Sequence, residues 1–441
     1  MSEVWSNWAG NQHATPVEVI RPADADEVAA VVAGAAAAGR RVKAVGTGHS
    51  FTAIAVAPDI QLTLSQLDQV VALDRRSGLV TVEAGMPLWR LGQLLADAGM
   101  SLSNLGDIDR QTVSGALATG THGTGARIGG LATQVRAMDL VLGDGRQVHC
   151  SPQERPALFA AARVGLGALG LVTAVTLQAE PAFRLHAEER PMALDRVLAD
   201  LDELVATNEH FEFFWFPHTA KTLTKRNNRL APGETERPLG RARRLLDDEV
   251  LGNGAFELTC RLGSRAPALI PRINEVAARL MGDRAYTASS HEVFVSPRRV
   301  RFVEMEYAVP RAAVADALRG VARVIETAQL RVSFPVEVRF SAGDDIPLST
   351  ASGRDSAYLA VHLFRGEPFE RYFRGVEAVM DGLEGRPHWG KMHFQDAESL
   401  ARRYPRFEEF VAVRDEVDPE GVFGNDYLDR VLGPVRSRRV G

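Results

Sequence analysis

The sequence predicts a mixed α+β protein that folds as two domains. With 441 residues the chain can form two cores, because a single domain usually spans about 100 to 200 residues. Before Pro181, short strands and helices are interrupted by three glycine-rich stretches, whereas after it glycine becomes sparse. There, amphipathic helices alternate with strands that have one polar face, a pattern typical of an antiparallel sheet backed by helices. We therefore expect a first domain over residues 1–180 and a second that begins at residue 181.

Composition and charge narrow the classes of function. The formal net charge of −5 gives no overall positive field that would attract nucleic acid or anionic lipid. The two cysteines, Cys150 and Cys260, lack the CxxC or Cys/His spacing of a zinc site, and we predict no metal. No stretch approaches the roughly 18 apolar residues that cross a bilayer, and the first residues do not form a signal peptide. We expect a cytoplasmic protein without a transmembrane segment.

The elements of the first domain follow from local signals. Residues 24–39 have acids in the first turn, many alanines and a closing glycine, which predicts a helix. A short apolar strand that breaks into glycines follows at 41–51. Residues 79–85 predict another strand, and residues 87–100, with Pro87 first and leucines at helical spacing, predict a second helix. Two alternating segments around an Asp-Gly turn over 138–150 predict a hairpin.

The second domain is predicted from longer patterns. Apolar residues recur at helical spacing over 194–205 and again over 314–325. Five segments predict strands: FEFFWF, RFVEMEYAV, SFPVEVRF, AYLAVHLF and HWGKMHF. The polar stretch 221–244 is interpreted as a mobile loop, and its basic cluster, Arg241, Arg243 and Arg244, as a solvated face.

Three glycine-rich loops favour an extended ligand. The loops lie at 45–50, 114–130 and 165–170, where exposed amides and absent Cβ atoms allow the backbone to approach a diphosphate. The first loop alone is weak evidence, because Phe51 stands where a GxGxxG dinucleotide fingerprint requires glycine. That departure argues against a nicotinamide-linked dehydrogenase. Three such loops within 180 residues favour an extended cofactor over a small one.

Four motifs together carry a family resemblance: VGTGHSF at 45–51, SGALATGTHGTG at 114–125, GALGLVTAVTL at 167–177 and HWGKMHF at 388–394. With them the chain resembles flavoproteins of the vanillyl-alcohol oxidase type, nearest the aldonolactone oxidoreductases and the alditol oxidases. The resemblance implies a two-domain FAD-binding fold of the PCMH type. It implies an FAD domain over 1–180, an antiparallel-sheet substrate cap over 181–395, and a C-terminal segment, 396–441, that completes the FAD domain.

The resemblance also implies how FAD is held. His49 would carry a covalent bond to the 8α-methyl group of the flavin, and Gly106, which has no Cβ, would leave dioxygen access to the reduced flavin. For His122 a role in the core is as well supported as contact with the cofactor. The full set of implied cofactor contacts is Gly46, Thr47, Gly48, His49, Ser50, Gly106, Thr112, Gly115, Gly120, His122, Gly123, Thr124 and Val172.

Candidate catalytic residues lie in the second domain. Strand alternation in VEVRF places Glu337 and Arg339 on one face, about 6.6 Å apart. From the sequence alone a solvated sheet edge explains this pair better, since Pro335 precedes it. The resemblance places Glu337, Arg339 and Lys391 around the substrate, with Arg339 and Lys391 holding negative charge on the reacting oxygen. Which residue acts as the general base stays open, because a desolvated lysine beside an arginine can itself be neutral and accept the proton.

Two further residues are weaker candidates for substrate contact. These are Thr112 and His362, although an isolated histidine such as His362 between apolar neighbours is more often a core residue. The resemblance implies oxidation of a hydroxyl of L-gulono- or D-arabinono-1,4-lactone, with O₂ or another electron acceptor as the second partner. An alditol oxidase that makes an aldose and hydrogen peroxide is the alternative, and a flavin-binding protein without turnover is a third possibility.

Overall fold

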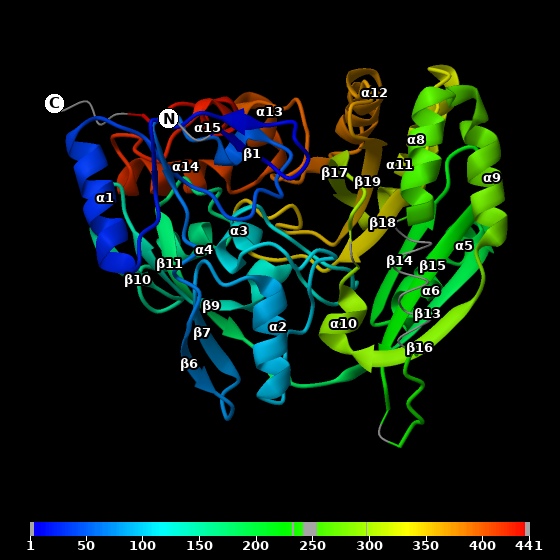
Figure 1. Cartoon of the computed structure of the whole chain (residues 1–441), viewed down its shortest axis with the longest axis horizontal. Helices are drawn as coiled ribbons and strands as arrows, with labels where there is room; N and C mark the ends of the chain where they lie inside the picture. Colours follow the sequence, from blue (N-terminus) through cyan, green and yellow to red (C-terminus); the bar gives the residue numbers. More distant parts are fainter. Residues whose placement is uncertain (1–3, 232, 241–253, 297, 437–441) are drawn as a thin grey trace.

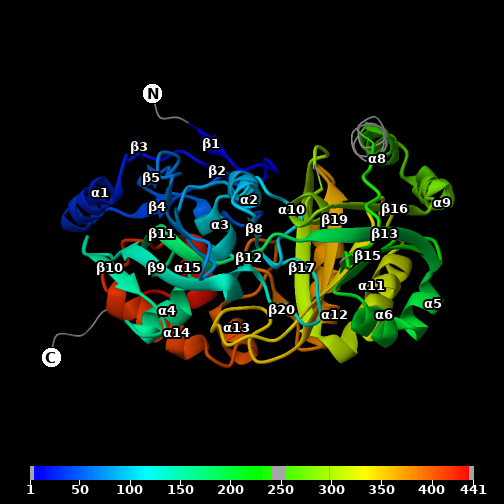
Figure 2. The same cartoon turned by 90° about the horizontal axis from the view of Figure 1, so that it is seen from below.

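The protein, described by a computed structural model over residues 4–231, 233–240, 254–296 and 298–436, has two lobes side by side (Figures 1 and 2). The first lobe contains the N-terminal part of the chain and the C-terminal helices, drawn in blue, cyan and red. The second lobe contains most of the segment between them. Among the described residues, no helix is both long and apolar enough to cross a membrane.

The first lobe is built on two sheets. A parallel sheet has the order β3 (Glu18–Ile20), β5 (Ile60–Leu62), β4 (Val42–Ala44). An antiparallel sheet has the order β10 (Gln147–Cys150), β9 (Val135–Val141), β11 (Leu171–Gln178), β7 (Leu79–Glu83), β6 (Val70–Asp74). The early helices are α1 (Ala25–Ala37), α2 (Leu88–Asp97), α3 (Val113–Ala118) and α4 (Pro156–Ala162). Two small pairs add β1 (Trp5–Ser6) with β2 (His13–Ala14), and β8 (Met100–Ser101) with β12 (Glu180–Pro181).

Local signals in the first lobe behave as predicted. The side chain of Asp24 caps α1 by accepting from the Glu27 amide at 2.8 Å, and Gly39 follows the helix at a φ of +64°. The predicted hairpin forms between β9 and β10. Helix α2 lies within the predicted range 87–100 but is shorter at both ends, because Pro87 is its N-cap residue and Met100 already belongs to β8.

The C-terminal segment returns to the first lobe. Its helices are α13 (Ala397–Arg403), α14 (Phe407–Val417) and α15 (Asp426–Leu432). Phe410 and Leu428 are buried in the same core as Val80 and Phe159. The side-chain amide of Asn425 donates to the carbonyls of Ala53, Ile54 and Val56 at 2.9 to 3.2 Å. The first lobe is thus completed by helices that begin more than 200 positions after its last strand.

The second lobe is built on one antiparallel sheet of eight strands. Their order is β16 (Arg284–Ser289), β13 (Arg184–Ala193), β15 (Lys221–Arg229), β14 (His210–Trp215), β18 (Val336–Ser341), β19 (Ser356–Phe364), β17 (Phe302–Pro310), β20 (Arg386–Pro387). The helices of this lobe are α5 (Leu194–Ala199), α6 (Leu201–Thr207), α8 (Phe256–Arg265), α9 (Ile270–Leu280), α10 (Ser290–Phe294), α11 (Val314–Thr327) and α12 (Glu370–Asp381). The predicted mixed α+β fold is therefore confirmed, and the exact domain limits stay predictions.

The predicted loop at 221–244 is wrong over its first third. Lys221–Arg229 forms β15, which pairs with β13 on one side and β14 on the other. The polar side chains of this strand led to the wrong prediction of a loop. Thr222 and Thr224 are fully buried and donate to carbonyls of β13. The basic cluster Arg241, Arg243 and Arg244 lies outside the described residues.

Three other predictions about the second lobe are wrong. The strand expected at 388–394 is a turn and an irregular segment, because β20 ends at Pro387. The helix expected over 194–205 is broken at Asp200 into α5 and α6. The strand of Glu337, β18, is interior and not an edge, because it pairs with β14 on one side and β19 on the other. Pro335 lies just before its first residue, where a strand tolerates proline.

Candidate active site

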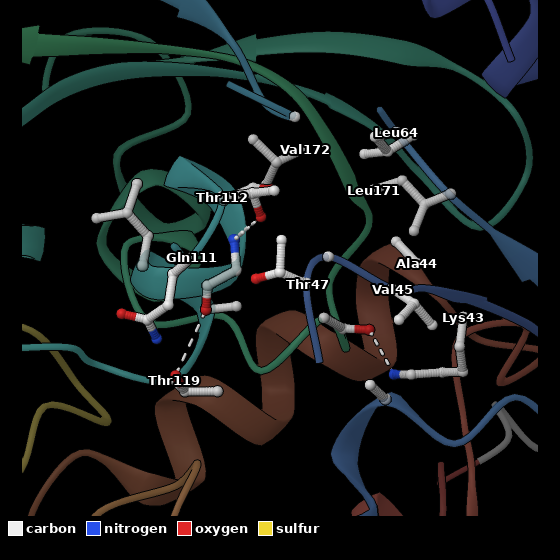
Figure 3. A pocket seen from close by; sticks show the side chains of 18 of the residues that line it. Lys43, Ala44, Val45, Thr47, Leu64, Gln111, Thr112, Thr119, Leu171 and Val172 are labelled. Atoms are coloured by element: carbon white, nitrogen blue, oxygen red, sulfur yellow. Dashed lines mark hydrogen bonds between the residues drawn. The ribbon is translucent and has the colours of Figure 1, made fainter. Parts of the chain in front are cut away.

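The three glycine-rich loops enclose a long cavity in the first lobe, with a volume of about 260 Å³ (Figure 3). One wall is the segment that follows β4, the second is the start of α3, and the third is the turn before β11. Apolar side chains such as Leu64, Leu171 and Val172 lie beside the polar groups of Thr47, Thr112 and Thr119. The cavity is thus suited to a ligand with both ring systems and polar groups.

Close backbone contacts hold these loops together. A Cβ on Gly46 would lie 2.7 Å from Thr112 Oγ1, so the first loop can approach α3 only without a side chain there. Thr112 Oγ1 accepts from the Gly115 amide at 3.2 Å and caps α3. Lys43 donates to the carbonyls of Gly167 and Phe423 at 3.1 and 3.0 Å, and its burial lowers its pKa to about 7. Lys43 therefore ties the third loop and the C-terminal segment to the first loop.

The structure divides the predicted cofactor contacts. The long cavity is lined by Gly46, Thr47, Gly48, His49, Ser50, Thr112, Gly115 and Val172. Gly106 and His122 line a neighbouring polar cavity instead. Gly120, Gly123 and Thr124 do not line the long cavity: Gly120 faces Val164, Gly123 packs against Asn104, and the Thr124 hydroxyl accepts from the Phe340 amide of β18. Their loop reaches past the long cavity to the sheet of the second lobe.

The polar cavity, of about 70 Å³, adjoins the long cavity at His49 and Ser50, which line both. It brings together the three predicted catalytic residues, Glu337, Arg339 and Lys391, with His362. Thr112, the other predicted substrate contact, lines the long cavity, while its neighbour Gln111 lines both. The predicted catalytic group therefore lies where the two lobes meet, beside the glycine loops.

Arg339 is held by carboxylates on several sides. Its Nε atom donates to Glu212 Oε2 at 2.8 Å, and its Nη2 atom contacts the carboxylate of Glu337. Asp107 lies 3.9 Å from Nη2 and accepts from Arg298 Nε at 2.8 Å. Burial raises the pKa of Glu337, and the attraction of Arg339 only partly offsets this. For Asp107 the balance is reversed, because Arg298 and Arg339 outweigh burial and hold its pKa well below the usual range.

Lys391 forms an ion pair with Glu304 of β17, and the same carboxylate lies 3.5 Å from His362 Nε2. Burial alone would raise the pKa of Glu304, but Lys391 and His362 outweigh it and hold the value well below the usual range. Lys391 therefore faces an ionised carboxylate in this cavity. Its role in the reaction stays a prediction.

Two of the missed site residues had a signal in the sequence. The segment VEMEYAV places Glu304 and Glu306 on the same face of one strand, and both are buried. Carboxylates at alternate positions of an otherwise apolar strand require partners when buried. Burial would raise the pKa of Glu306, but His122, with Nε2 at 3.2 Å, lowers it to about 2. His122 also stacks on Tyr358 with ring centroids 3.6 Å apart. Asp107, Glu212, Arg298 and His388 carried no comparable signal.

Glu306, His122 and His388 lie close enough to hold a metal ion, but their hydrogen bonds argue against one. Their ligand atoms are within 4.8 Å of one another, and all three residues are buried. His388 Nδ1 accepts from the Gly390 amide at 3.1 Å, so the hydrogen of the neutral ring is on Nε2. That tautomer leaves no free lone pair for a cation. The absence of a metal stays a prediction.

The surroundings of the His49 ring favour its neutral form. Its Nδ1 atom is buried and has no hydrogen-bond partner among the described residues. Burial lowers the pKa of His49 to about 4, and the positive charge of Lys391 adds to the shift. The imidazole is therefore neutral near pH 7, with a lone pair on one ring nitrogen.

Comparison with known proteins identifies the family. An FAD binding domain model matches residues 16–151, and a D-arabinono-1,4-lactone oxidase model matches residues 175–431. The chain belongs to the D-arabinono-1,4-lactone oxidase family. It is 45% identical over 434 residues to an L-gulono-1,4-lactone dehydrogenase of Mycobacterium tuberculosis, which covers 98% of this chain and 100% of that protein. The predicted vanillyl-alcohol oxidase type, its aldonolactone branch and FAD binding are confirmed.

Two further matches place the fold and the neighbouring branch. A Streptomyces alditol oxidase is 35% identical over 445 residues, which covers 98% of this chain and 100% of that protein. A solved structure of cholesterol oxidase from B. sterolicum superposes with a TM-score of 0.83 at 19% identity, covering 98% of this chain and 97% of that one. At that identity the likeness concerns the two-domain fold alone. The chain is an FAD-dependent oxidoreductase of the family.

Replacing Lys391 by Met should destabilise the protein in a pH-dependent manner. Without the ammonium, the buried Glu304 carboxylate loses its main partner, its pKa rises, and the cost at pH 7 is about 3–5 kcal/mol. In the wild type the depressed pKa of Glu304 gives stability that is fully present above the unfolded pKa of about 4.3, so this contribution is constant from about pH 4.5 to 8. In the variant the pKa of Glu304 is raised, so stability is lost as pH rises toward that pKa. The difference in stability between wild type and variant should therefore widen as pH rises from 4.5 to 8, as measured by thermal unfolding.

The matched control is Lys391→Met combined with Glu304→Gln, which removes the unpaired charge and should restore a gap that does not vary with pH. A single variant whose gap is constant across this range would contradict the ion pair.

Proposed function

We propose that the protein oxidises a hydroxyl group of an aldono-1,4-lactone, with L-gulono- or D-arabinono-1,4-lactone as the substrate. The observation that carries the proposal is that Glu337, Arg339 and Lys391 converge on the polar cavity, and that His49 lines both this cavity and the long cavity. The names of the matched family and of the 45% identical dehydrogenase support a lactone. The 35% identical alditol oxidase supports an open-chain polyol as the second candidate.

Charge around the polar cavity suits alcohol oxidation. FAD, held by the three glycine loops, supplies the acceptor for the hydride of the carbinol carbon. Negative charge grows on the substrate oxygen as its proton leaves, and Arg339 and Lys391 are the two cations that hold it. Both are already fixed by buried carboxylates, Glu212 and Glu304, so little reorganisation is needed.

Glu337 takes the hydroxyl proton in this proposal. Among the carboxyl groups that line the polar cavity, Asp107, Glu304 and Glu306 are held ionised at low pKa by cations or by His122, whereas burial raises the pKa of Glu337. A base works best when its pKa approaches the working pH, which favours Glu337. Arg339, in contact with Glu337, orients it.

A panel of aldonolactones and alditols, added without oxygen, tests the substrate class. We expect the lactones to bleach the yellow absorbance of the wild type within one turnover and the alditols to act more slowly. Glu337→Gln should keep its colour and bleach about 10²- to 10⁴-fold more slowly, because it loses the proton acceptor. Stopped-flow absorbance measures both.

Faster bleaching by alditols would assign the second candidate. A flavin that no member of the panel bleaches would overturn the proposed function and leave a binding protein. Glu337→Gln that bleaches at the wild-type rate would remove Glu337 as the base.

We also propose that His49 is joined covalently to FAD. The buried, unpartnered Nδ1 atom and the lowered pKa of His49 fit a neutral nucleophile at the junction of the two cavities. Attachment forms one N–C bond to the 8α-carbon in place of one N–H and one C–H bond. Two protons are released, and the two electrons leave through the flavin to O₂ or another two-electron acceptor.

Acid precipitation tests the bond. The wild-type pellet should stay yellow, and the intact mass should exceed the sequence mass by one FAD, less two hydrogens. His49→Ala should give a colourless pellet and a yellow supernatant, since the glycine loops remain to bind FAD. A colourless wild-type pellet would refute the covalent link.

Gly106 supports dioxygen as an electron acceptor in this proposal. It lines the polar cavity, and a Cβ there would lie 2.7 Å from Thr121 Cγ2, so the space beside it is narrow. Gly106→Ala should slow reoxidation of the reduced enzyme by air-saturated buffer by about tenfold, equivalent to ~1.4 kcal/mol. Stopped-flow return of the yellow absorbance provides the measurement.

The double variant Gly106→Ala, Thr121→Ser removes the methyl contact while keeping the added Cβ, and should remain slow if the Cβ blocks oxygen. If the wild type is reoxidised slowly and Gly106→Ala makes no difference, the protein is a dehydrogenase that uses another acceptor. That outcome would agree with the name of the 45% identical relative, a dehydrogenase.

A further inference from the structure

An N-terminal hairpin packs over the loop that carries His49. Strands β1 and β2 pair antiparallel, with Trp5 opposite Ala14 and Ser6 opposite His13. The hairpin lies along the upper edge of the first lobe, in dark blue (Figure 1). Its turn is organised by Asn7, which is 3% exposed and whose Oδ1 atom accepts from the amides of Asn11 and Gln12 at 3.0 and 3.1 Å.

The hairpin donates hydrogen bonds to the carbonyl groups on both sides of His49. The Trp8 amide donates to Gly48 at 2.8 Å, before His49. The Asn7 side-chain amide donates to Ser50 at 2.9 Å, after it. The next carbonyl, of Phe51, accepts from the side-chain amides of Asn11 and Gln12 at 2.9 and 3.1 Å. Four donors of one short segment thus fix the backbone of this loop.

Side chains of the hairpin also cover the loop. The Trp8 ring lies over His49 with centroids 5.8 Å apart and planes 30° apart, and it meets the edge of Phe302 in the second lobe at 5.2 Å. A Cβ on Gly48 would lie 3.3 Å from Trp5, so the hairpin packs closely on that side as well. Trp5 lines the long cavity and Trp8 the polar one.

The second lobe holds the hairpin from the other side. Arg301 Nη1 donates to the Trp8 carbonyl at 2.7 Å. The hairpin is therefore fixed between the two lobes at the point where both cavities reach His49. Its position does not depend on the first lobe alone.

We infer that Asn7 and Trp8 are positioning residues for the attachment of FAD to His49. A nucleophile reacts efficiently only when it is held near its attacking geometry, and small displacements are costly. The donated hydrogen bonds fix the backbone of the loop, and the Trp8 ring restricts the imidazole and excludes water from it. This inference rests on the proposed covalent link at His49.

The experiment compares holoenzymes of the wild type, Asn7→Ala, Trp8→Ala and Trp8→Phe. His13→Ala is the matched control, because His13 is an exposed residue of the same hairpin. Total flavin is measured by absorbance, covalent flavin by what the acid pellet retains, and the fold by thermal unfolding. We expect Asn7→Ala and Trp8→Ala to keep bound FAD but to lose most of the covalent fraction. Trp8→Phe should recover most of it, and His13→Ala should match the wild type.

The outcomes separate this inference from the proposal on which it depends. A wild type without covalent flavin overturns both. A covalent wild type whose Asn7→Ala and Trp8→Ala variants are equally covalent overturns the positioning role alone. Equal losses of total and covalent flavin, with a lower unfolding temperature, would show that the hairpin acts only on stability and would also overturn it.

Should Trp8→Ala fail to fold, Asn11→Ala removes one of the two donors to Phe51 and leaves both tryptophans in place. An intermediate covalent fraction is then expected for Asn11→Ala. If Asn11→Ala and Asn7→Ala, each made as a single variant, were both fully covalent, the inference would be contradicted.

Discussion

Pairing of buried charges between distant segments is the constraint on which this structure depends. Glu304 of β17 meets Lys391, which follows β20, and Arg339 of β18 meets Glu212 of β14. Asp107 of the first lobe meets Arg298 of the second. A buried charge without a partner is expensive, so each pair fixes the position of two segments at once. The same pairs leave a set of oriented cations around the polar cavity, and stability and reactivity here have one origin.

Sequence patterns predicted the fold class because each lobe repeats a simple signal. Alanine-rich, capped and glycine-terminated residues gave α1, and an Asp-Gly turn between alternating segments gave the hairpin of β9 and β10. Prediction failed where tertiary context replaced periodicity. Strand β15 is polar because its threonines bond to neighbouring carbonyls and its Lys225 faces the carboxylate of Glu212. The segment at 388–394 alternates like a strand, but Trp389 is buried in the first core and Lys391 reaches the polar cavity.

The candidate site divides in the same way. The glycine loops were visible because unusual composition signals an unusual backbone, and eight of the implied cofactor contacts line the long cavity. Partners such as Glu212 and Asp107 were not visible, since their significance comes from residues more than 100 positions away. Glu304 and Glu306 stand between these cases: the alternation of carboxylates in an apolar strand was present, and only its burial gave it meaning.

The return of α13, α14 and α15 to the first core has a consequence for how the chain is made. Those helices supply core side chains such as Phe410 and Leu428, which leave the ribosome only after the whole second lobe. The sheet of the second lobe, formed from Arg184 to Pro387, can assemble while translation continues. The first lobe begins the chain and completes its core last, and its contacts span most of the sequence, which slows folding. A stable FAD cavity therefore requires synthesis of the chain through α15, after the whole second lobe.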